Sequence, residues 1–248
     1  MRFKKVVKLF DSGNVCVTGL RGTGKDMLSG NVVARRKKDY VSNLDYNCKK
    51  STYHKLDFNK LDLGGTTYKD MINGTQKYYV YPYPIGSDIY ISDVGVYFPS
   101  QYCNDLNRDY KNLPMYMALS RQLSHNNVHI NVQNLNRAWD KIREQSDTYI
   151  RCRRCKVFFG KIVFQQITIY DKYQSCLDRV EPCRIRVPAM ASKEVKQNAK
   201  MYVDKFRNSY GTIKNHILLY WNKSNYDTYY FEKLFASGVD ENAKTKDI

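Results

Sequence analysis

The feature that most constrains the fold is a glycine-rich loop between a short β-branched segment and a stretch of helical character. Residues 15–18 read Val-Cys-Val-Thr, and residues 19–25 read Gly-Leu-Arg-Gly-Thr-Gly-Lys, which matches the G-x-x-x-x-G-K pattern of a phosphate-binding loop. Glycines let successive backbone N–H groups turn toward one anion because no Cβ stands in the way. The strand before the loop and the helix after it supply the context that the pattern requires. The segment therefore predicts an α/β domain that binds phosphate groups.

Each part of this loop has an expected role. Lys25 brings a cation to the β and γ phosphates of a nucleotide, and the helix that follows adds its positive N-terminus. The residue after the lysine is Asp26, where Ser or Thr usually ligates Mg²⁺. A carboxylate also binds Mg²⁺, because hard cations prefer oxygen. The sequence thus predicts ATP and Mg²⁺ as ligands, with the nucleotide held by Gly19, Arg21, Gly22, Thr23, Gly24, Lys25 and Asp26.

A second acid is expected on a neighbouring strand. Asp88 to Asp93 reads as a buried strand ending in an acid, so Asp93 is the predicted second Mg²⁺ carboxylate. The next residue is Val94, at a position where many hydrolysing motors carry a glutamate that activates water. Either another acid supplies this base, or hydrolysis is slow, or the nucleotide serves as a switch. Gln133 follows the strand-like segment 128–132 and is the predicted sensor of the γ phosphate.

Strand-like and helix-like segments alternate along most of the chain. This alternation predicts a RecA-like P-loop NTPase fold, with a mostly parallel central sheet flanked by helices. Residues 1–175 are the expected ATPase core, 176–238 a small α/β extension and 239–248 a disordered tail. Helices are expected at Leu113 to Ser124, at Asn136 to Gln145 and at Pro188 to Arg207.

The charge of the chain favours a polyanionic partner. Lys and Arg total 41 against 24 Asp and Glu, which gives a formal net charge of +17. Neutralising phosphates releases counterions, so nucleic acid is the expected partner, although a lysine-rich proteome would also produce a basic protein. Arg121, Arg137 and Arg143 are candidates for a finger that acts across a subunit interface. Arg151, Arg153 and Arg154 are candidates for the lining of a DNA path, with ordinary surface arginines as the alternative in each case.

The sequence favours a cytoplasmic location. Basic residues near the N-terminus are not followed by an apolar segment of the kind a signal peptide needs. No run approaches the ~20 apolar residues that span a bilayer. The seven cysteines fit a reducing compartment. Cys152 and Cys155 have the spacing of zinc ligands, but buried structural thiols are the favoured interpretation.

Taken in order, these motifs resemble the zonula occludens toxin (Zot) family of filamentous-phage assembly ATPases, within the wider FtsK/HerA group of DNA-pumping motors. The segments that carry the resemblance are Gly19 to Lys25, Tyr40 to Asn43, Ile89 to Pro99, Leu119 to Arg151 (with Gln133-Asn134 and Lys141-Ile142-Arg143) and Tyr226-Asp227-Thr228. Members of the family usually carry an Asp-Glu pair where Asp93-Val94 is matched here. Many also continue into a membrane span.

The resemblance implies a RecA-like core that hydrolyses ATP in a homo-oligomeric ring and acts on single- or double-stranded viral DNA. Because no membrane span is expected here, the chain would need a membrane or capsid protein partner to anchor it, or would work as a soluble packaging motor, in either case in the host cytoplasm. Two other hypotheses stay open. One is a nucleotide-binding switch or scaffold in virion assembly with little ATP turnover. The other is a basic DNA-binding protein whose P-loop is vestigial.

Overall fold

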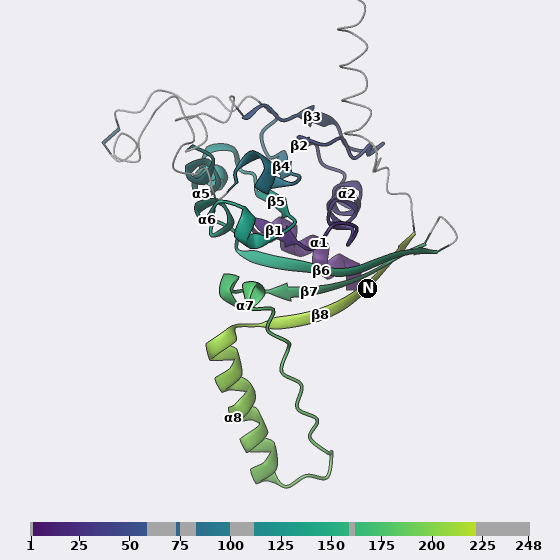
Figure 1. Cartoon of the computed structure of the whole chain (residues 1–248), viewed down its shortest axis with the longest axis vertical. Helices are drawn as coiled ribbons and strands as arrows, with labels where there is room; N and C mark the ends of the chain where they lie inside the picture. The colour runs from purple at the N-terminus through teal and green to yellow at the C-terminus, as the bar shows by residue number, and fades with distance from the viewer. Residues whose placement is uncertain (1, 59–72, 75–82, 100–111, 159–161, 222–248) are drawn as a thin grey trace, which may run out of the picture.

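The computed structural model describes residues 2–58, 73–74, 83–99, 112–158 and 162–221 (Figure 1). The strands are β1 (Val15–Thr18), β2 (Tyr40–Ser42), β3 (Tyr53–Lys55), β4 (Asp88–Ile91), β5 (Val128–Val132), β6 (Thr148–Phe158), β7 (Ile162–Tyr170) and β8 (Ile213–Trp221). The helices are α1 (Arg2–Ser12), α2 (Lys25–Arg36), α4 (Val94–Tyr97), α5 (Asn112–Ser124), the 3₁₀ turn η4 (Leu135–Arg137), α6 (Asp140–Arg143), α7 (Tyr173–Leu177) and α8 (Lys193–Tyr210).

All eight described strands form one sheet in the order β3-β2-β4-β5-β1-β6-β7-β8. Every pairing from β3 to β6 is parallel, and the pairings of β7 with β6 and with β8 are antiparallel. The predicted fold class, a mostly parallel sheet with flanking helices, is confirmed. From β1 the chain crosses to β2, returns through β4 and β5, and later continues on the other side of β1 in β6. The carboxyl end of β1 is therefore a switch point of the strand order, where α/β sheets bind ligands.

The two faces of the sheet are covered by different helices. Successive residues of a strand point to opposite faces, so Cys16 packs in one apolar cluster while Val15 and Val17 pack in the other. The cluster that contains Val15 and Val17 also takes side chains from α1 and α2. The cluster that contains Cys16 takes side chains from α4, α5, α6 and α7. Figure 1 shows α2 on one side of β1, β4 and β5, and α5 and α6 on the other.

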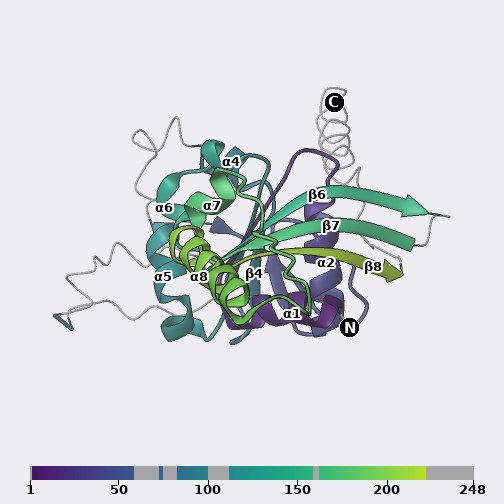
Figure 2. The same cartoon turned by 90° about the horizontal axis from the view of Figure 1, so that it is seen from below.

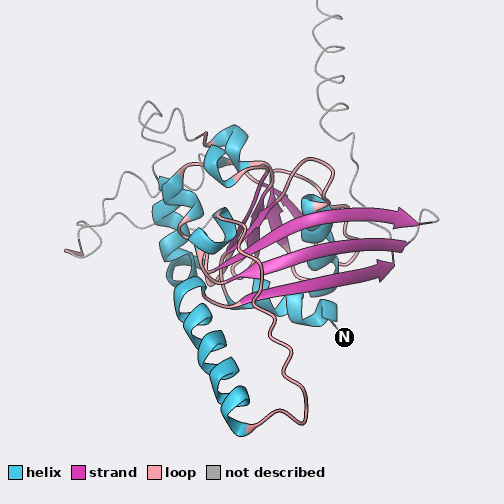
Figure 3. Cartoon of the chain, turned by 60° about the horizontal axis from the view of Figure 1, so that its bottom comes forward, coloured by secondary structure: helices cyan, strands magenta, loops and turns pink. Residues whose placement is uncertain are grey.

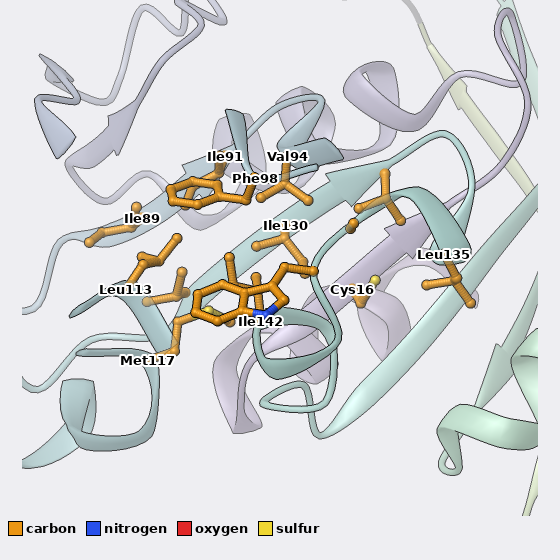
Figure 4. Close-up of a cluster of buried hydrophobic side chains, with 14 of the residues drawn as sticks. Cys16, Ile89, Ile91, Val94, Phe98, Leu113, Met117, Ile130, Leu135 and Ile142 are labelled. Atoms are coloured by element: carbon orange, nitrogen blue, oxygen red, sulfur yellow. The ribbon is translucent and has the colours of Figure 1, made fainter. Parts of the chain in front are cut away.

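Val94 belongs to this second apolar cluster and not to the surface. Its side chain is 0% exposed and lies beside Ile91 and Phe98 (Figure 4). Because α4 begins immediately after Asp93, the chain turns inward at this point. The position after Asp93 is therefore a core position.

The last three strands extend the sheet on the far side of β1. β6 and β7 are the longest pair, and β8 joins the free edge of β7 (Figure 3). β8 therefore belongs to the same sheet as β1, although it follows residue 175. The division at residue 175 and the expected tail stay predictions, since residues 222–248 lie outside the described part, as does the segment 226–228.

Several local expectations differ from the structure. The helix expected over Asn136 to Gln145 is wrong as a single element, because Ala138 and Trp139 are extended between η4 and α6. Trp139 N–H donates to the carbonyl of Phe98 at 3.0 Å, which replaces the helical bond. The helix expected from Pro188 begins at Lys193, where Ser192 caps it. Helix α1 and strand β3 were not expected from the sequence.

Helix α8 projects away from the sheet in Figure 1, so it comes toward the viewer in Figure 2, which is seen from below. It has no buried residue, and several of its apolar side chains are exposed, among them Val195, Met201 and Tyr202. Within the described residues, no helix combines the length and the apolar character needed to cross a membrane.

A buried ion pair joins the last residue of α2 to the first residue of β4. The Arg36 guanidinium pairs with Asp88, and each side chain is only 5% exposed. The other carboxylate oxygen of Asp88 accepts from the backbone N–H of Asn127 at 2.9 Å. Asp11 is a second partner of Arg36 at 2.9 Å, and the hydroxyl of Tyr90 lies at the same distance. Breaking a pair of this kind leaves an uncompensated charge in the interior.

We expect Asp88→Asn to lower the free energy of unfolding by about 3–5 kcal/mol, because the new amide N–H₂ faces the guanidinium that it should neutralise. Denaturant titration measures the change. The control is Glu181→Gln, which removes the exposed carboxylate that pairs with Arg153 at 2.6 Å and should cost about 1 kcal/mol or less. Equal losses in the two variants would contradict a structural role for the buried pair.

Candidate phosphate-binding site

The loop from Gly19 to Lys25 connects the carboxyl end of β1 to the first turn of α2. Gly22 and Gly24 have φ angles of 77° and 80°, in the left-handed region that favours glycine. Within the loop, the N–H and the hydroxyl of Thr23 both donate to the carbonyl of Leu20, at 3.2 and 2.7 Å. The backbone thus turns tightly over the start of α2.

Gly24 lies where only a glycine fits. A Cβ at this position would lie 2.9 Å from Sγ of Cys155 and 3.0 Å from Nε2 of Gln165. Gly24 is also the N-cap of α2, and its lack of a side chain leaves the first turn without a capping side chain. Helix amides that no side chain caps are available to an anion.

Gln165 braces the loop from β7. It is fully buried, and its Nε2 donates to the carbonyls of Thr23 and Gly24, both at 2.9 Å. These two bonds hold the loop carbonyls away from the side where phosphate would bind. Gln165 was not singled out from the sequence, because it lies 140 residues from the loop in a strand whose register the sequence does not reveal.

Lys25 is buried beneath the loop, with 5% of its surface exposed. Its Nζ lies 3.4 Å from the carbonyl of Leu20. Among the described residues, no carboxylate lies within ion-pair distance of this ammonium. Burying an unpaired cation is costly, so an anion at the loop would compensate it. This observation fits a bound phosphate group.

The carboxylate of Asp26 ties α2 to two strands. Its Oδ1 accepts from the hydroxyl of Ser92 at 2.5 Å and from Nδ2 of Asn131 at 2.7 Å. Asn131 also accepts from the hydroxyl of Ser29, one turn further along α2, at 3.1 Å. Asp26 is therefore oriented by side chains that follow β4 and belong to β5.

Asn43 holds Ser92 in place from the end of β2. Its Oδ1 accepts from the backbone N–H of Ser92 at 2.8 Å, and its Nδ2 donates to the carbonyl of Ser92 at 3.0 Å. The ends of β2, β4 and β5 thus meet over the first turn of α2. Carboxylate and hydroxyl oxygens gathered there fit Mg²⁺, which prefers hard oxygen ligands.

The chain has a P-loop nucleotide-binding fold. Its glycine-rich loop links a buried central strand to a helix that no side chain caps, and a lysine and an acid begin that helix. The carboxylate of Asp26 and the hydroxyl of Ser92, oxygens of the kind that Mg²⁺ prefers, lie at the same edge of the sheet. The predicted binding residues Gly19, Arg21, Gly22, Thr23, Gly24, Lys25 and Asp26 all belong to this loop and first turn.

Asp93 lies beside the P-loop but not on the strand next to it. We expected its strand to neighbour β1, and this detail is wrong, because β5 lies between β4 and β1. Nε2 of Gln133, which follows β5, lies 3.5 Å from Oδ1 of Asp93. Burial raises the pKa of Asp93 above its ordinary value, the Asp26 carboxylate raises it further, and Lys25 opposes this shift. The two acids and the lysine therefore share one electrostatic environment.

Three predicted arginines line a cavity of about 610 Å³ beside the P-loop. Arg151, Arg153 and Arg154 all come from β6, and Gly19, Leu20 and Thr23 of the loop also line the cavity. Arg179, which the sequence analysis did not single out, lines the same cavity. The volume falls within the range of about 300–1,000 Å³ typical of ligand pockets.

The other three predicted arginines lie elsewhere. Arg137 lines a small cavity with Asp93 and Gln133. Arg143 donates to the carbonyl of Leu135 and lies over the ring of Tyr173. Arg121 contacts Asp147, at the amino ends of the strands and so at the edge opposite the P-loop. Their roles at an interface stay predictions.

Three solved structures illustrate the architectures to which this chain is similar. The N-terminal domain of zonular occludens toxin from Neisseria meningitidis is 12% identical, with a TM-score of 0.42, over 89% of this chain and 97% of that one. The genome packaging NTPase B204 from Sulfolobus turreted icosahedral virus 2, in complex with ATP-gammaS, is 13% identical (TM-score 0.36; 84% and 92%). ATPases 2 and 3 of EssC from Geobacillus thermodenitrificans are 11% identical (TM-score 0.40; 81% and 45%).

The family that the motifs resemble is thus found again among the similar structures. Neither a protein-family model nor a curated protein sequence matches the chain.

We expect Gln165→Leu, which keeps the size of the side chain but removes both bonds to the loop, to weaken nucleotide binding about tenfold. The carbonyl of Thr23 loses its side-chain donor, whereas that of Gly24 still accepts from the backbone N–H of Leu28 at 2.9 Å. The free energy of unfolding should therefore also fall, by about 1 kcal/mol. Titration with a fluorescent ATP analogue and denaturant unfolding measure the two effects. Gln197→Leu on the exposed face of α8 is the control, and unchanged binding in Gln165→Leu would show that the brace does not shape the loop.

Proposed function

We propose that the chain is an ATP-dependent nucleic-acid translocase that packages or extrudes viral DNA during virion assembly. The observation that carries the nucleotide half of this proposal is the buried ammonium of Lys25, which has no ion pair among the described residues and lies under a glycine loop at the start of α2. A structural lysine in such a position would have an acid partner. A lysine that binds phosphate needs none, because the ligand brings the charge.

The nucleic-acid half rests on charge and its position. The chain carries a formal net charge of +17, and Arg151, Arg153 and Arg154 lie together beside the loop. Of these three, Arg153 has an acidic partner among the described residues, the exposed Glu181. A row of cations next to a nucleotide site suits a polyanion whose movement is coupled to ATP.

The proposal includes the assembly that such a motor needs. A homo-oligomeric ring would surround the DNA, and Arg121, Arg137 or Arg143 would act as a finger on a neighbouring subunit's nucleotide. A membrane or capsid protein partner would hold the ring in place, in the host cytoplasm. Mg²⁺ bound with the nucleotide would neutralise phosphate charge, with Asp26 and Asp93 as its predicted ligands.

A second candidate function is a nucleotide-binding switch or scaffold with little ATP turnover. The observation that favours it is Val94, which follows Asp93 and is packed in the core. No side chain at that position could activate water. A vestigial P-loop in a basic DNA-binding protein is the third possibility.

We expect wild-type protein to hydrolyse ATP, with a rate that DNA stimulates, and Lys25→Ala to lose this turnover by at least about 100-fold, because the phosphates lose their cation. The control is Lys4→Ala, an exposed lysine of α1 that should leave turnover unchanged. Steady-state phosphate release with and without DNA measures the rates. DNA binding should weaken as salt rises.

The same assay separates the three hypotheses. Turnover that DNA stimulates and that Lys25→Ala abolishes supports the motor. Nucleotide binding without turnover supports the switch. A wild-type protein that binds DNA but no nucleotide would rule out both in favour of the vestigial loop.

A further inference from the structure

The contact between Asp26 and Ser92 has the chemistry of a P-loop magnesium site with its two residues exchanged. In P-loop NTPases the residue after the lysine is usually a Ser or Thr, and the carboxylate stands at the tip of a strand. Here the residue after the lysine is Asp26, and the residue after β4 is Ser92. The two side chains meet at 2.5 Å, hydroxyl to carboxylate.

Both residues are held as a binding pair would be. Ser92 is 1% exposed, and Asn43 binds its backbone on both sides. Both hydrogen bonds to Asp26 go to Oδ1, one from Ser92 and one from Asn131. Among the described residues, no hydrogen-bond donor to Oδ2 of Asp26 is found. One oxygen of Asp26 is thus fixed by two protein donors.

The direction of the chain after Ser92 also indicates that Ser92, and not Asp93, occupies the strand-tip position of the metal carboxylate. Val94 is turned into the core beside Phe98 (Figure 4), so it cannot be a position that faces a nucleotide. Asp93 is the last side chain of this segment at the site, where Gln133 and Lys25 lie near it. If Ser92 occupies the strand-tip position of the metal carboxylate, Asp93 occupies the next position, where many motors carry their water-activating acid.

We propose that Asp26 supplies the carboxylate and Ser92 the hydroxyl of an exchanged magnesium pair, and that Asp93 is the base that activates water and not the second Mg²⁺ ligand that the sequence predicts. This inference rests on the proposed nucleotide-binding function. In the hydrolytic step the water oxygen bonds to the γ phosphorus and its proton passes to the Asp93 carboxylate. The bond from the γ phosphorus to the bridging oxygen breaks, and ADP and inorganic phosphate leave. Val94 then has no bearing on turnover, because the acid stands one residue earlier.

The exchange is tested by swapping the two side chains between positions 26 and 92, first one at a time and then together. Asp26→Ser removes the carboxylate, and Ser92→Asp sets two carboxylates against each other, which disfavours ionisation of both. We expect each single variant to weaken Mg²⁺-dependent binding of a fluorescent ATP analogue by about 10-fold or more, and Ser92→Asp to lower the melting temperature. The double variant, with Ser at 26 and Asp at 92, should recover binding to within about threefold of wild type, because contacting residues are coupled.

A double variant no better than the product of the two single effects would overturn the exchange. If the double variant does not fold, Asp26→Asn answers the question, because it keeps the shape and the bond from Ser92. It should melt near the wild-type temperature but bind the analogue equally with and without EDTA. Wild-type Mg²⁺ dependence in Asp26→Asn would also overturn the proposal. Wild-type protein that binds no nucleotide is a different result, since it removes the proposed function itself.

Asp93→Asn tests whether Asp93 is the base that activates water. We expect it to bind the analogue with Mg²⁺ to within about twofold of wild type while turnover falls at least about 100-fold, because only the base is lost. Asp140→Asn, an exposed acid at the start of α6, is the matched control and should change neither quantity. Loss of Mg²⁺-dependent binding in Asp93→Asn would assign Asp93 to the metal and overturn its role as base. A wild-type protein that binds nucleotide without turnover would overturn that role too, and leave the exchanged pair to the binding experiment.

Discussion

Everything at the candidate site depends on the way α2 is fastened to β4 at both of its ends. At one end Asp26 accepts from Ser92, and at the other Arg36 pairs with Asp88. The two lengths match. Ten steps of about 1.5 Å along the helix cover roughly 15 Å, and four steps of about 3.3 Å along the strand cover roughly 13 Å. The helix that carries the phosphate loop therefore lies at a set height over the strand that carries the acids.

The two fastenings differ in what surrounds them. The Arg36 end is enclosed by aromatic and charged side chains, so it contributes to stability and contacts no part of the loop. The Asp26 end lies at the edge of the sheet, where its carboxylate shares an electrostatic environment with Asp93 and Lys25. A nucleotide bound there would meet a helix whose far end is held by a buried ion pair. Such preorganisation lowers the entropic cost of ordering the site when the nucleotide binds.

Much of this arrangement could be predicted from local patterns. Gly19 to Lys25 is recognisable because every residue that makes the loop is contiguous, and β1, β4 and β5 are recognisable because buried parallel strands are short apolar runs. The interruption of the helix expected over 136–145 could not be predicted in this way. It depends on a hydrogen bond from the Trp139 N–H to the carbonyl of Phe98, which is distant in the sequence. Gln165 could not be found either. Its function comes from a contact between β7 and the loop that depends on the register of three strands.

The assignment of the acids shows most clearly what the sequence leaves open. A pattern that looks for an acid at the tip of a strand selects Asp93, since Ser92 carries no charge, and then finds Val94 where a base should stand. The side-chain directions move this assignment by one residue: Ser92 meets Asp26, Asp93 faces the site and Val94 faces the core. Exchanging an acid and a hydroxyl between two contacting positions conserves the pair while changing both motifs. A comparison residue by residue finds two departures from the usual P-loop pattern, at Asp26 and at Ser92. In the proposed exchange these two departures are one change, made between residues in contact.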